Sequence, residues 1–117
     1  MRKEVEEVST TVFDVSLALM DRAQQSEMSP LKLQKLSFFA FGWYSHLTGL
    51  DLFPETFYAM ERGPVVGELL SAHAGRRTVS RDTLLTQLDE RDGVQGDLEP
   101  FIERVLDAVW DHYGDSS

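Results

Sequence analysis

Apolar residues recur at helical spacing along most of the chain, and each periodic stretch predicts an amphipathic helix. The first stretch extends from about Thr11 to Gln25, with Asp14, Asp21 and Arg22 outside its apolar face. That face holds Val12, Phe13, Val15, Leu17, Leu19, Met20 and Ala23. We therefore expect a first helix that is buried along one broad side.

The second stretch has the clearest boundaries. Ser29 suits an N-cap, Pro30 suits the first helical position because that position needs no amide hydrogen, and Gly49 suits a left-handed stop. Lys35 lies at the edge of the apolar arc, where its ammonium would need a partner such as Glu61. The arc itself, expected to face the core, comprises Leu33, Leu36, Phe39, Ala40, Trp43, Tyr44 and Leu47.

The opposite side of this second helix also carries aromatic residues. One interpretation is that the first or the last helix packs over this side. The other is that Phe41 stays exposed in the free domain and serves as an apolar anchor for a partner. The residues on this side are Phe38 and Phe41, together with the polar Gln34, Ser37, Ser45 and Thr48.

Shorter elements lie between the second helix and the last one. Phe57–Glu61 predicts a short extended segment. Pro64 suits the first position of another helix, for which Gly75 is the predicted stop. A further short helix is expected around Leu84–Leu88.

The last predicted helix is Leu98–Tyr113, with Asp97 as its N-cap. Its outer side is acidic, which indicates either a solvated surface or a docking face for a basic protein. The acidic positions are Glu99, Glu103, Asp107 and Asp111. The inward positions are Leu98, Phe101, Ile102, Val105, Leu106, Val109, Trp110 and Tyr113.

Together these elements predict a mainly α fold. A chain of 117 residues suffices for one modest core, so we expect a single domain over residues 1–117. The predicted architecture is a small helical bundle around a central aromatic-rich helix. At most a short β-hairpin or extended segment is expected near residues 52–62.

The net charge of −9 is unevenly distributed and bears on the class of partner. Residues 1–81 contain 9 Lys/Arg against 10 Asp/Glu, whereas residues 82–117 contain 2 against 10. An acidic surface repels phosphate backbones, so we expect no direct nucleic-acid binding.

Few groups are available for catalysis or for holding a cofactor. The chain has no cysteine, which excludes disulfides and thiolate metal sites and suits a reducing cytoplasm. His46, His73 and His112 are not at metal-ligand spacing on one helix, and His73 is expected to be a hydrogen-bonded core residue. We therefore expect no catalytic residue, no metal, no cofactor and no enzymatic activity.

Targeting and membrane signals do not stand out either. The N-terminal MRKEVEEVSTT has no apolar core of signal-peptide length, and no apolar run approaches membrane-spanning length. The expectation is a cytoplasmic protein without membrane contact.

Two motifs, taken together, resemble those of a known family. LKLQKLSFFAFGWY resembles the K-L-x-K-L-L-Y-x-A of the SocA-like or Panacea antitoxin domain family, with its phage-associated GepA-like proteins. FYAMERGPVV resembles the extended A-x-x-x-G-P-V that follows in that family. The motif positions here are Lys32, Leu33, Lys35, Leu36, Ser37, Phe38 and Ala40, then Ala59, Gly63, Pro64 and Val65.

The chain also departs from the family pattern. Phe38 replaces the usual tyrosine, Ser37 a usual aliphatic residue and Phe41 a usual polar residue. Family members usually continue past a Tyr-Gly pair, here Tyr113-Gly114, into a further segment. Because this sequence ends at Ser117, we expect a domain without that segment.

The resemblance implies the antitoxin of a toxin–antitoxin system, such as prophages carry, which neutralises a toxin encoded beside it by direct protein–protein binding. An alternative within the family is an adaptor that delivers its toxin to an ATP-dependent protease. A phage-associated regulatory protein is a third alternative. The acidic charge favours a toxin of basic character, and a homodimer is left open.

The candidate site residues follow from these two lines of reasoning. Those expected to contact a partner are Phe38, Phe41, Glu99, Glu103, Asp107 and Asp111. Those expected to maintain the family's structure are Lys35, Leu36, Trp43, Gly63, Pro64 and Val65. At Gly63 we expect a backbone conformation that a side chain would strain.

Overall fold

Helices account for most of the residues that the computed structural model describes, 10–91 and 98–114. The fold is therefore mainly α, as the sequence predicts. The helices are α1 (Val12–Ala23), α2 (Pro30–Thr48), α3 (Gly67–His73), α4 (Arg81–Arg91) and α5 (Pro100–Tyr113). The strands are β1 (Glu27–Met28), β2 (Phe57–Met60), β3 (Gly63–Val66) and β4 (Val79–Ser80).

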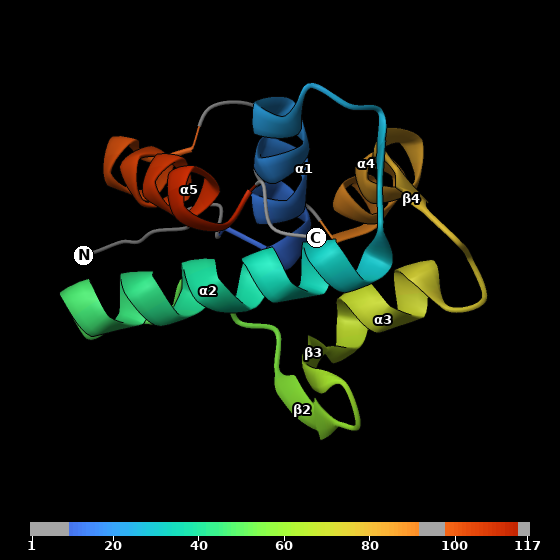
Figure 1. Cartoon of the computed structure of the whole chain (residues 1–117), viewed down its shortest axis with the longest axis horizontal. Helices are drawn as coiled ribbons and strands as arrows, with labels where there is room; N and C mark the ends of the chain where they lie inside the picture. Colours follow the sequence, from blue (N-terminus) through green and yellow to red (C-terminus); the bar gives the residue numbers. More distant parts are fainter. Residues whose placement is uncertain (1–9, 92–97, 115–117) are drawn as a thin grey trace, which may run out of the picture.

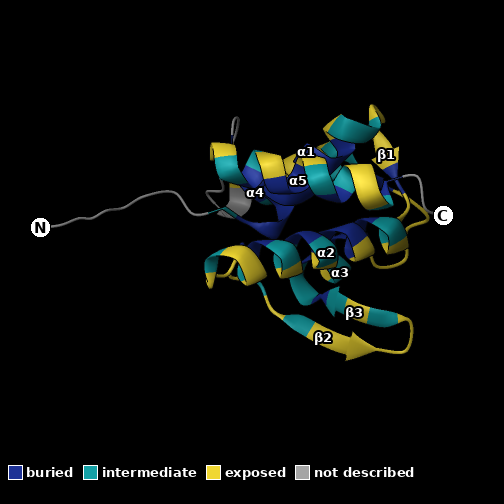
Figure 2. Ribbon diagram, turned by 60° about the vertical axis from the view of Figure 1, so that its left-hand side comes forward, coloured by how far each residue is buried: buried dark blue, intermediate teal, exposed yellow. Residues whose placement is uncertain are grey.

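The elements lie in layers on either side of α2 (Figures 1 and 2). Helices α1, α4 and α5 lie on one side, and the hairpin of β2 and β3 projects from the other. Helix α2 packs against α1, α5, α3 and β3. A second small antiparallel pair, β1 with β4, ties the α1–α2 connection to the start of α4.

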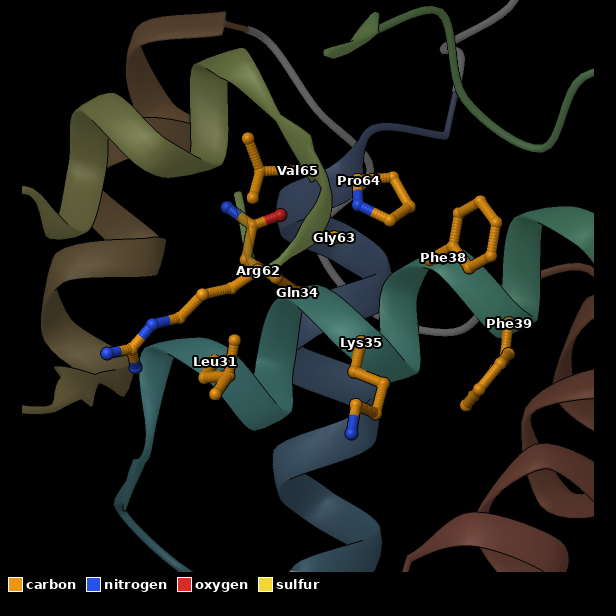
Figure 3. Close-up of a pocket in the computed structure, with 9 residues that line it drawn as sticks. All are labelled: Leu31, Gln34, Lys35, Phe38, Phe39, Arg62, Gly63, Pro64 and Val65. Carbon is orange, nitrogen blue, oxygen red and sulfur yellow. The ribbon is translucent and has the colours of Figure 1, made fainter. Parts of the chain in front are cut away.

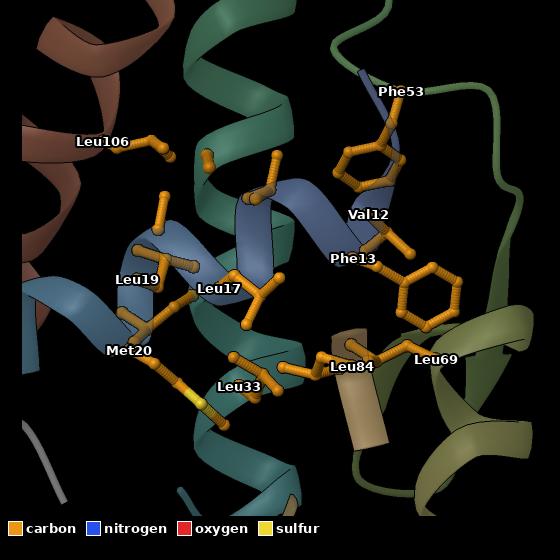
Figure 4. Packing of buried hydrophobic residues seen from close by; sticks show 14 of the residues in the cluster. Val12, Phe13, Leu17, Leu19, Met20, Leu33, Phe53, Leu69, Leu84 and Leu106 are labelled. Carbon is orange, nitrogen blue, oxygen red and sulfur yellow. The ribbon is translucent and has the colours of Figure 1, made fainter. Parts of the chain in front are cut away.

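Helix α1 is the most deeply buried helix of the described part. Its residues from Val12 to Met20 are all buried, including Asp14 and Ser16 (Figure 4). The prediction of burial along one side only is therefore wrong, because α2, α4 and α5 surround this helix. Its polar side chains are satisfied locally: the Ser16 hydroxyl donates to the Val12 carbonyl at 2.8 Å.

The ends of α1 are set by two kinds of cap. Thr11 is the N-cap and forms a capping box with Asp14, whose carboxylate accepts from the Thr11 amide at 2.8 Å. The Glu55 carboxylate, from the loop after α2, accepts from the Val12 amide at 3.0 Å. Gln24 ends the helix with a positive φ of 57°.

Helix α2 begins and ends where the sequence predicts. The Ser29 hydroxyl accepts from the Lys32 amide at 3.3 Å, and Gly49 takes a φ of +76°. The predicted core arc is buried in part: Phe39 and Trp43 are half-buried, and Leu47 in the last turn is 61% exposed. The buried members are Leu33, Leu36, Ala40 and Tyr44. An arc stays buried only as far as its neighbours extend, so the prediction for Leu47 is wrong.

The other side of α2 is covered, but not by the first or the last helix. The Phe41 ring meets Phe53 edge-on at a centroid distance of 5.0 Å and Phe57 at 5.2 Å. Gln34 and Ser37, predicted on this outer side, are buried. The expectation that the first or last helix packs here is therefore corrected: the loop before the hairpin and the hairpin itself do so.

The hairpin extends beyond the predicted extended segment. Strands β2 and β3 pair antiparallel from Phe57 opposite Val66 to Met60 opposite Gly63. Pro64 therefore lies in β3, and α3 begins only at Gly67, which corrects the predicted helix start. Pairing with β2 prevails over the helix-start signal of Pro64, because Val65 and Val66 favour strands.

The later helices agree with the sequence more closely. Helix α4 contains the predicted Leu84–Leu88 segment, and both of these leucines are buried. Helix α5 begins at Pro100 with Glu99 in the N-cap position, two residues later than predicted. The predicted N-cap, Asp97, lies outside the described residues.

Candidate partner-binding groove

A groove with a cavity of about 180 Å³ lies between the outer face of α2 and the β2–β3 hairpin (Figure 3). We call it the α2–β3 groove. Its α2 side is formed by Leu31, Gln34, Lys35, Phe38 and Phe39. Its hairpin side is formed by Arg62, Gly63, Pro64 and Val65.

The α2 side follows from the spacing of three residues. Leu31, Lys35 and Phe38 are separated by four and three positions, which places them on one face of a helix. Leu31 is 46% exposed and Phe38 is 40% exposed. The Phe38 ring is covered in part by Phe57, edge-on at 5.4 Å. The groove therefore presents apolar surface to the solvent.

The hairpin side depends on a tight turn. Glu61 and Arg62 connect the strands. Gly63 follows with a φ of +122°, a conformation that is strained for any residue with a side chain. The expectation for Gly63 is thus confirmed. Pro64 is exposed and carries no amide hydrogen, so β3 presents an apolar ring there rather than a hydrogen-bond donor.

Gln34 fixes the hairpin to α2. Its Oε1 accepts from the Val66 amide at 2.8 Å, and its Nε2 donates to the Val66 carbonyl at 3.3 Å. The side-chain amide of Gln34, 2% exposed, thus pairs with Val66 as a neighbouring strand would. The two sides of the groove are joined by this buried clamp, which limits how far they can separate.

His73 completes the clamp. Its Nε2 lies 3.0 Å from the Nε2 of Gln34. Because the Gln34 amide nitrogen is a donor, the imidazole accepts through Nε2 and is neutral, with its proton on Nδ1. Burial lowers the pKa of His73 below its ordinary value of 6.5, in the same direction. The prediction of a hydrogen-bonded core histidine is confirmed.

Two cations border the groove. Lys35 and Arg62 are both exposed and extend from opposite sides of it. Among the described residues neither cation has an ion-pair partner. The prediction that Glu61 pairs with Lys35 is therefore wrong. The groove is therefore an apolar surface with positive charge at its rim, in a chain of net charge −9.

The acidic side of α5 is partly engaged within the chain. Arg22 of α1 donates to Glu103 at 2.7 Å and to Asp107 at 2.9 Å. The other Glu103 oxygen accepts from the Leu98 amide at 3.3 Å. Glu99 and Asp111 are exposed, so the four carboxylates do not form the uniform outer face that the helical pattern predicts.

The structure separates the predicted site residues into groups. The groove brings together Phe38, Lys35, Gly63, Pro64 and Val65, which come from both sequence motifs. Phe41 lies apart from the groove lining, against Phe53 and Phe57. The remaining structural residues lie in the core or at its edge: Leu36 is buried, and half-buried Trp43 meets His112 edge-on at 5.2 Å.

The sequence did not indicate four residues of the groove lining: Leu31, Gln34, Phe39 and Arg62. Phe39 was expected to face the core. The spacing of Leu31 from Lys35 and Phe38 was a usable signal for the first. Gln34 has no local signal, because its partner Val66 is 32 positions away. Arg62 reaches the groove because it lies in the hairpin turn. The sequence predicted a helix start at Pro64 and therefore no such turn.

Neither a metal site nor a membrane-spanning helix emerges from the described residues. No group of three or more His, Asp or Glu side chains among residues 10–91 and 98–114 is arranged to hold a metal ion. In the same part of the chain, every helix is too short or too polar to cross a membrane. Comparisons with family models, curated proteins and solved structures find no match to this chain.

Proposed function

We propose that this chain is an antitoxin domain of the SocA-like or Panacea type, which neutralises a protein toxin by binding it directly. One observation carries the proposal. The two sequence motifs that bear the resemblance are separated along the chain, yet Lys35 and Phe38 of the first line the same groove as Gly63, Pro64 and Val65 of the second.

The chemistry of the groove suits such a role. A protein that acts by covering another needs accessible apolar surface on rigid elements, and Phe38 and Leu31 supply it on α2. The Gln34 clamp holds the opposing wall in place. As parts of the same proposal, the domain is a helical bundle with α2 at its centre, acts in the cytoplasm and catalyses no reaction.

The proposal is tested by growth rescue. The product of the reading frame beside this gene is induced in a bacterial host, with and without co-expression of this chain. We expect growth arrest by the neighbouring protein alone and restored growth with both. Size-exclusion chromatography of the two purified proteins then checks whether they form a complex. A neighbouring protein that is harmless, or toxic in spite of this chain, contradicts the proposal.

Phe38 provides a site-specific test. Phe38→Asp should abolish rescue, because it places a carboxylate in the centre of the apolar face. Leu85 on α4 is also 40% exposed, so Leu85→Asp is a matched control that should rescue as wild type does. Repeating the assay in hosts that lack ATP-dependent proteases distinguishes direct neutralisation from delivery to a protease, since only the latter would lose rescue there.

A basic region of the toxin is proposed to contact the acidic side of α5. With Glu103 and Asp107 paired to Arg22, the exposed Glu99 and Asp111 are the residues to test. Glu99→Lys/Asp111→Lys should slow association with the toxin at low salt, and less so at high salt. An unchanged association rate in stopped-flow measurements would assign these carboxylates to solubility alone.

A further inference from the structure

The size of the α2–β3 groove restricts what can occupy it. Its cavity measures about 180 Å³. Cavities of roughly 150 Å³ accept a single benzene ring, whereas pockets for cofactors and other drug-sized ligands begin at about 300 Å³. The groove therefore has room for one large apolar side chain.

The shape of the groove restricts the occupant further. It is bounded by a helix face on one side and by the hairpin on the other, and its Leu31 and Phe38 walls are open to solvent (Figure 3). A side chain could enter only while its backbone stays outside, along the rim. This arrangement suits a side chain on another polypeptide.

The charges at the rim define what flanks that side chain. Lys35 extends from α2 between Leu31 and Phe38, and Arg62 extends from the hairpin turn towards Leu31 (Figure 3). Both cations are exposed, and neither is neutralised within the described residues. The whole chain carries a net charge of −9, whereas the two cations make the charge at the rim of this apolar groove positive.

The groove is also held ready for an occupant. The clamp from Gln34 to Val66 and His73 is buried, and it fixes the hairpin relative to α2. A preformed site loses less conformational entropy on binding than one that must close.

We propose that the α2–β3 groove binds an acidic segment of the toxin that presents one large apolar side chain, with carboxylates on either side of it. The apolar side chain enters between Phe38 and Pro64, and the flanking carboxylates pair with Lys35 and Arg62. The identity of the partner rests on the proposed function, whereas the chemistry of the bound segment rests on the groove alone.

The groove chemistry is tested with short peptides and the full chain. Two-dimensional NMR spectra are recorded during titration with the capped peptide Glu-Glu-Phe-Glu-Glu. We expect shifts of the Leu31, Lys35 and Gly63 amides, which decrease as salt is raised. Glu-Glu-Ala-Glu-Glu and Lys-Lys-Phe-Lys-Lys, which lack the ring or reverse the charge, should each bind at least about tenfold more weakly. Equal binding of the charge-reversed peptide, or shifts elsewhere on the surface, overturns the proposal.

Charge reversal on the protein provides the complementary test. Lys35→Glu/Arg62→Glu should weaken binding of the acidic peptide at least about tenfold, and Lys35→Arg/Arg62→Lys should retain it. Arg76→Glu/Arg77→Glu makes the same change of net charge on exposed residues outside the groove, and it should bind as wild type does. Melting temperatures of all three variants are measured in parallel. A loss of binding that the control variant shares overturns the assignment to the groove.

Two further outcomes are decisive. If the NMR chemical shifts of the groove amides change with protein concentration in the absence of peptide, a second copy of this chain is the occupant. The proposal of a toxin segment is then overturned. In the growth assay, Lys35→Glu/Arg62→Glu should lose rescue. Full rescue by this variant refutes the inference and leaves the antitoxin proposal standing. Failure of wild-type rescue refutes the antitoxin proposal, while the peptide titration still decides the groove chemistry.

Discussion

Helices α1 and α2 differ in a way that their sequences do not suggest. Helix α1 contains one aromatic residue, Phe13, in 12 positions, yet nine consecutive residues are buried. Helix α2 contains five aromatic residues in 19 positions, and its Leu31, Phe38 and Leu47 are exposed. Burial therefore follows how many neighbours surround a helix and not how many aromatic residues it carries.

The two helices also treat polar groups differently. In α1, buried Asp14 accepts from the N-cap residue Thr11, and buried Ser16 donates to Val12 of the same helix. In α2, the buried Gln34 bonds to the hairpin and to α3, which makes it a connection between elements. The first arrangement stabilises one helix, whereas the second builds the groove. We infer that α1 mainly determines stability, whereas the outer face of α2 mainly forms the surface for the binding proposed above.

The largest expected effect compares the same change in the two helices. Leu19→Ala removes a fully buried side chain from α1 and should cost about 2–5 kcal/mol of unfolding free energy. Leu31→Ala on α2 should cost no more than about 1 kcal/mol, because this side chain is half exposed. Chemical denaturation of both variants measures the difference. Equal losses would contradict the division of roles between the helices.

The second prediction concerns the clamp. Gln34→Leu keeps the volume but leaves the buried Val66 amide and carbonyl without their partner, which should cost about 1–3 kcal/mol. Hydrogen exchange should accelerate at Val66 more than in α1, since the hairpin loses its attachment. Gln25→Leu, at an exposed position after α1, is the control and should leave stability and exchange unchanged. A rise in exchange spread evenly over the chain would speak against a local clamp.

The third prediction compares two glycines beside or within α2. Gly63→Ala should cost about 1–3 kcal/mol, because its φ of +122° is unfavourable for a side chain. Gly42→Ala should instead stabilise the chain by about 0.5–1 kcal/mol, since Gly42 is helical and its added methyl group meets open space. The denaturation midpoints of the two variants are compared with that of the wild type. An unchanged midpoint for Gly63→Ala would show that the turn does not require glycine.

The fourth prediction is a pH dependence. Burial lowers the pKa of His73 in the folded chain, so between that pKa and 6.5 the unfolded chain binds a proton that the folded chain does not. Stability should therefore fall as pH falls below 6.5. His73→Gln removes this contribution, and the difference between the two stability–pH profiles isolates it. Parallel profiles between pH 5 and 7.5 would show that His73 does not contribute.

The smallest effect compares two fully buried serines. The Ser37 hydroxyl has no hydrogen-bond partner among the described residues, so Ser37→Ala should be neutral or should stabilise by up to about 1 kcal/mol. Ser16→Ala in α1 loses the bond to the Val12 carbonyl and should destabilise by about 0.5–1.5 kcal/mol. The opposite signs, measured by denaturation, would sharpen the comparison, and a destabilising Ser37→Ala would mean that its hydroxyl is satisfied.

The sequence alone determined the features that depend on neighbouring residues. The cap at Ser29, the stop at Gly49 and the special backbone of Gly63 were all predictable, because each acts within a few residues. The helical period located α1, α2 and α5 to within two residues and indicated the core of α4. Five of the nine residues that line the groove are motif positions, although nothing local showed that the motifs meet.

The tertiary structure alone decided what depends on distant partners. Pro64 lies in a strand because β2 pairs with it, and Gln34 is buried because Val66 lies 32 positions away in sequence and beside it in space. Arg22 engages Glu103 across 81 positions, so the acidic side of α5 is partly engaged within the chain. Capping and periodicity are local, whereas burial, strand pairing and ion pairing require knowing which elements become neighbours.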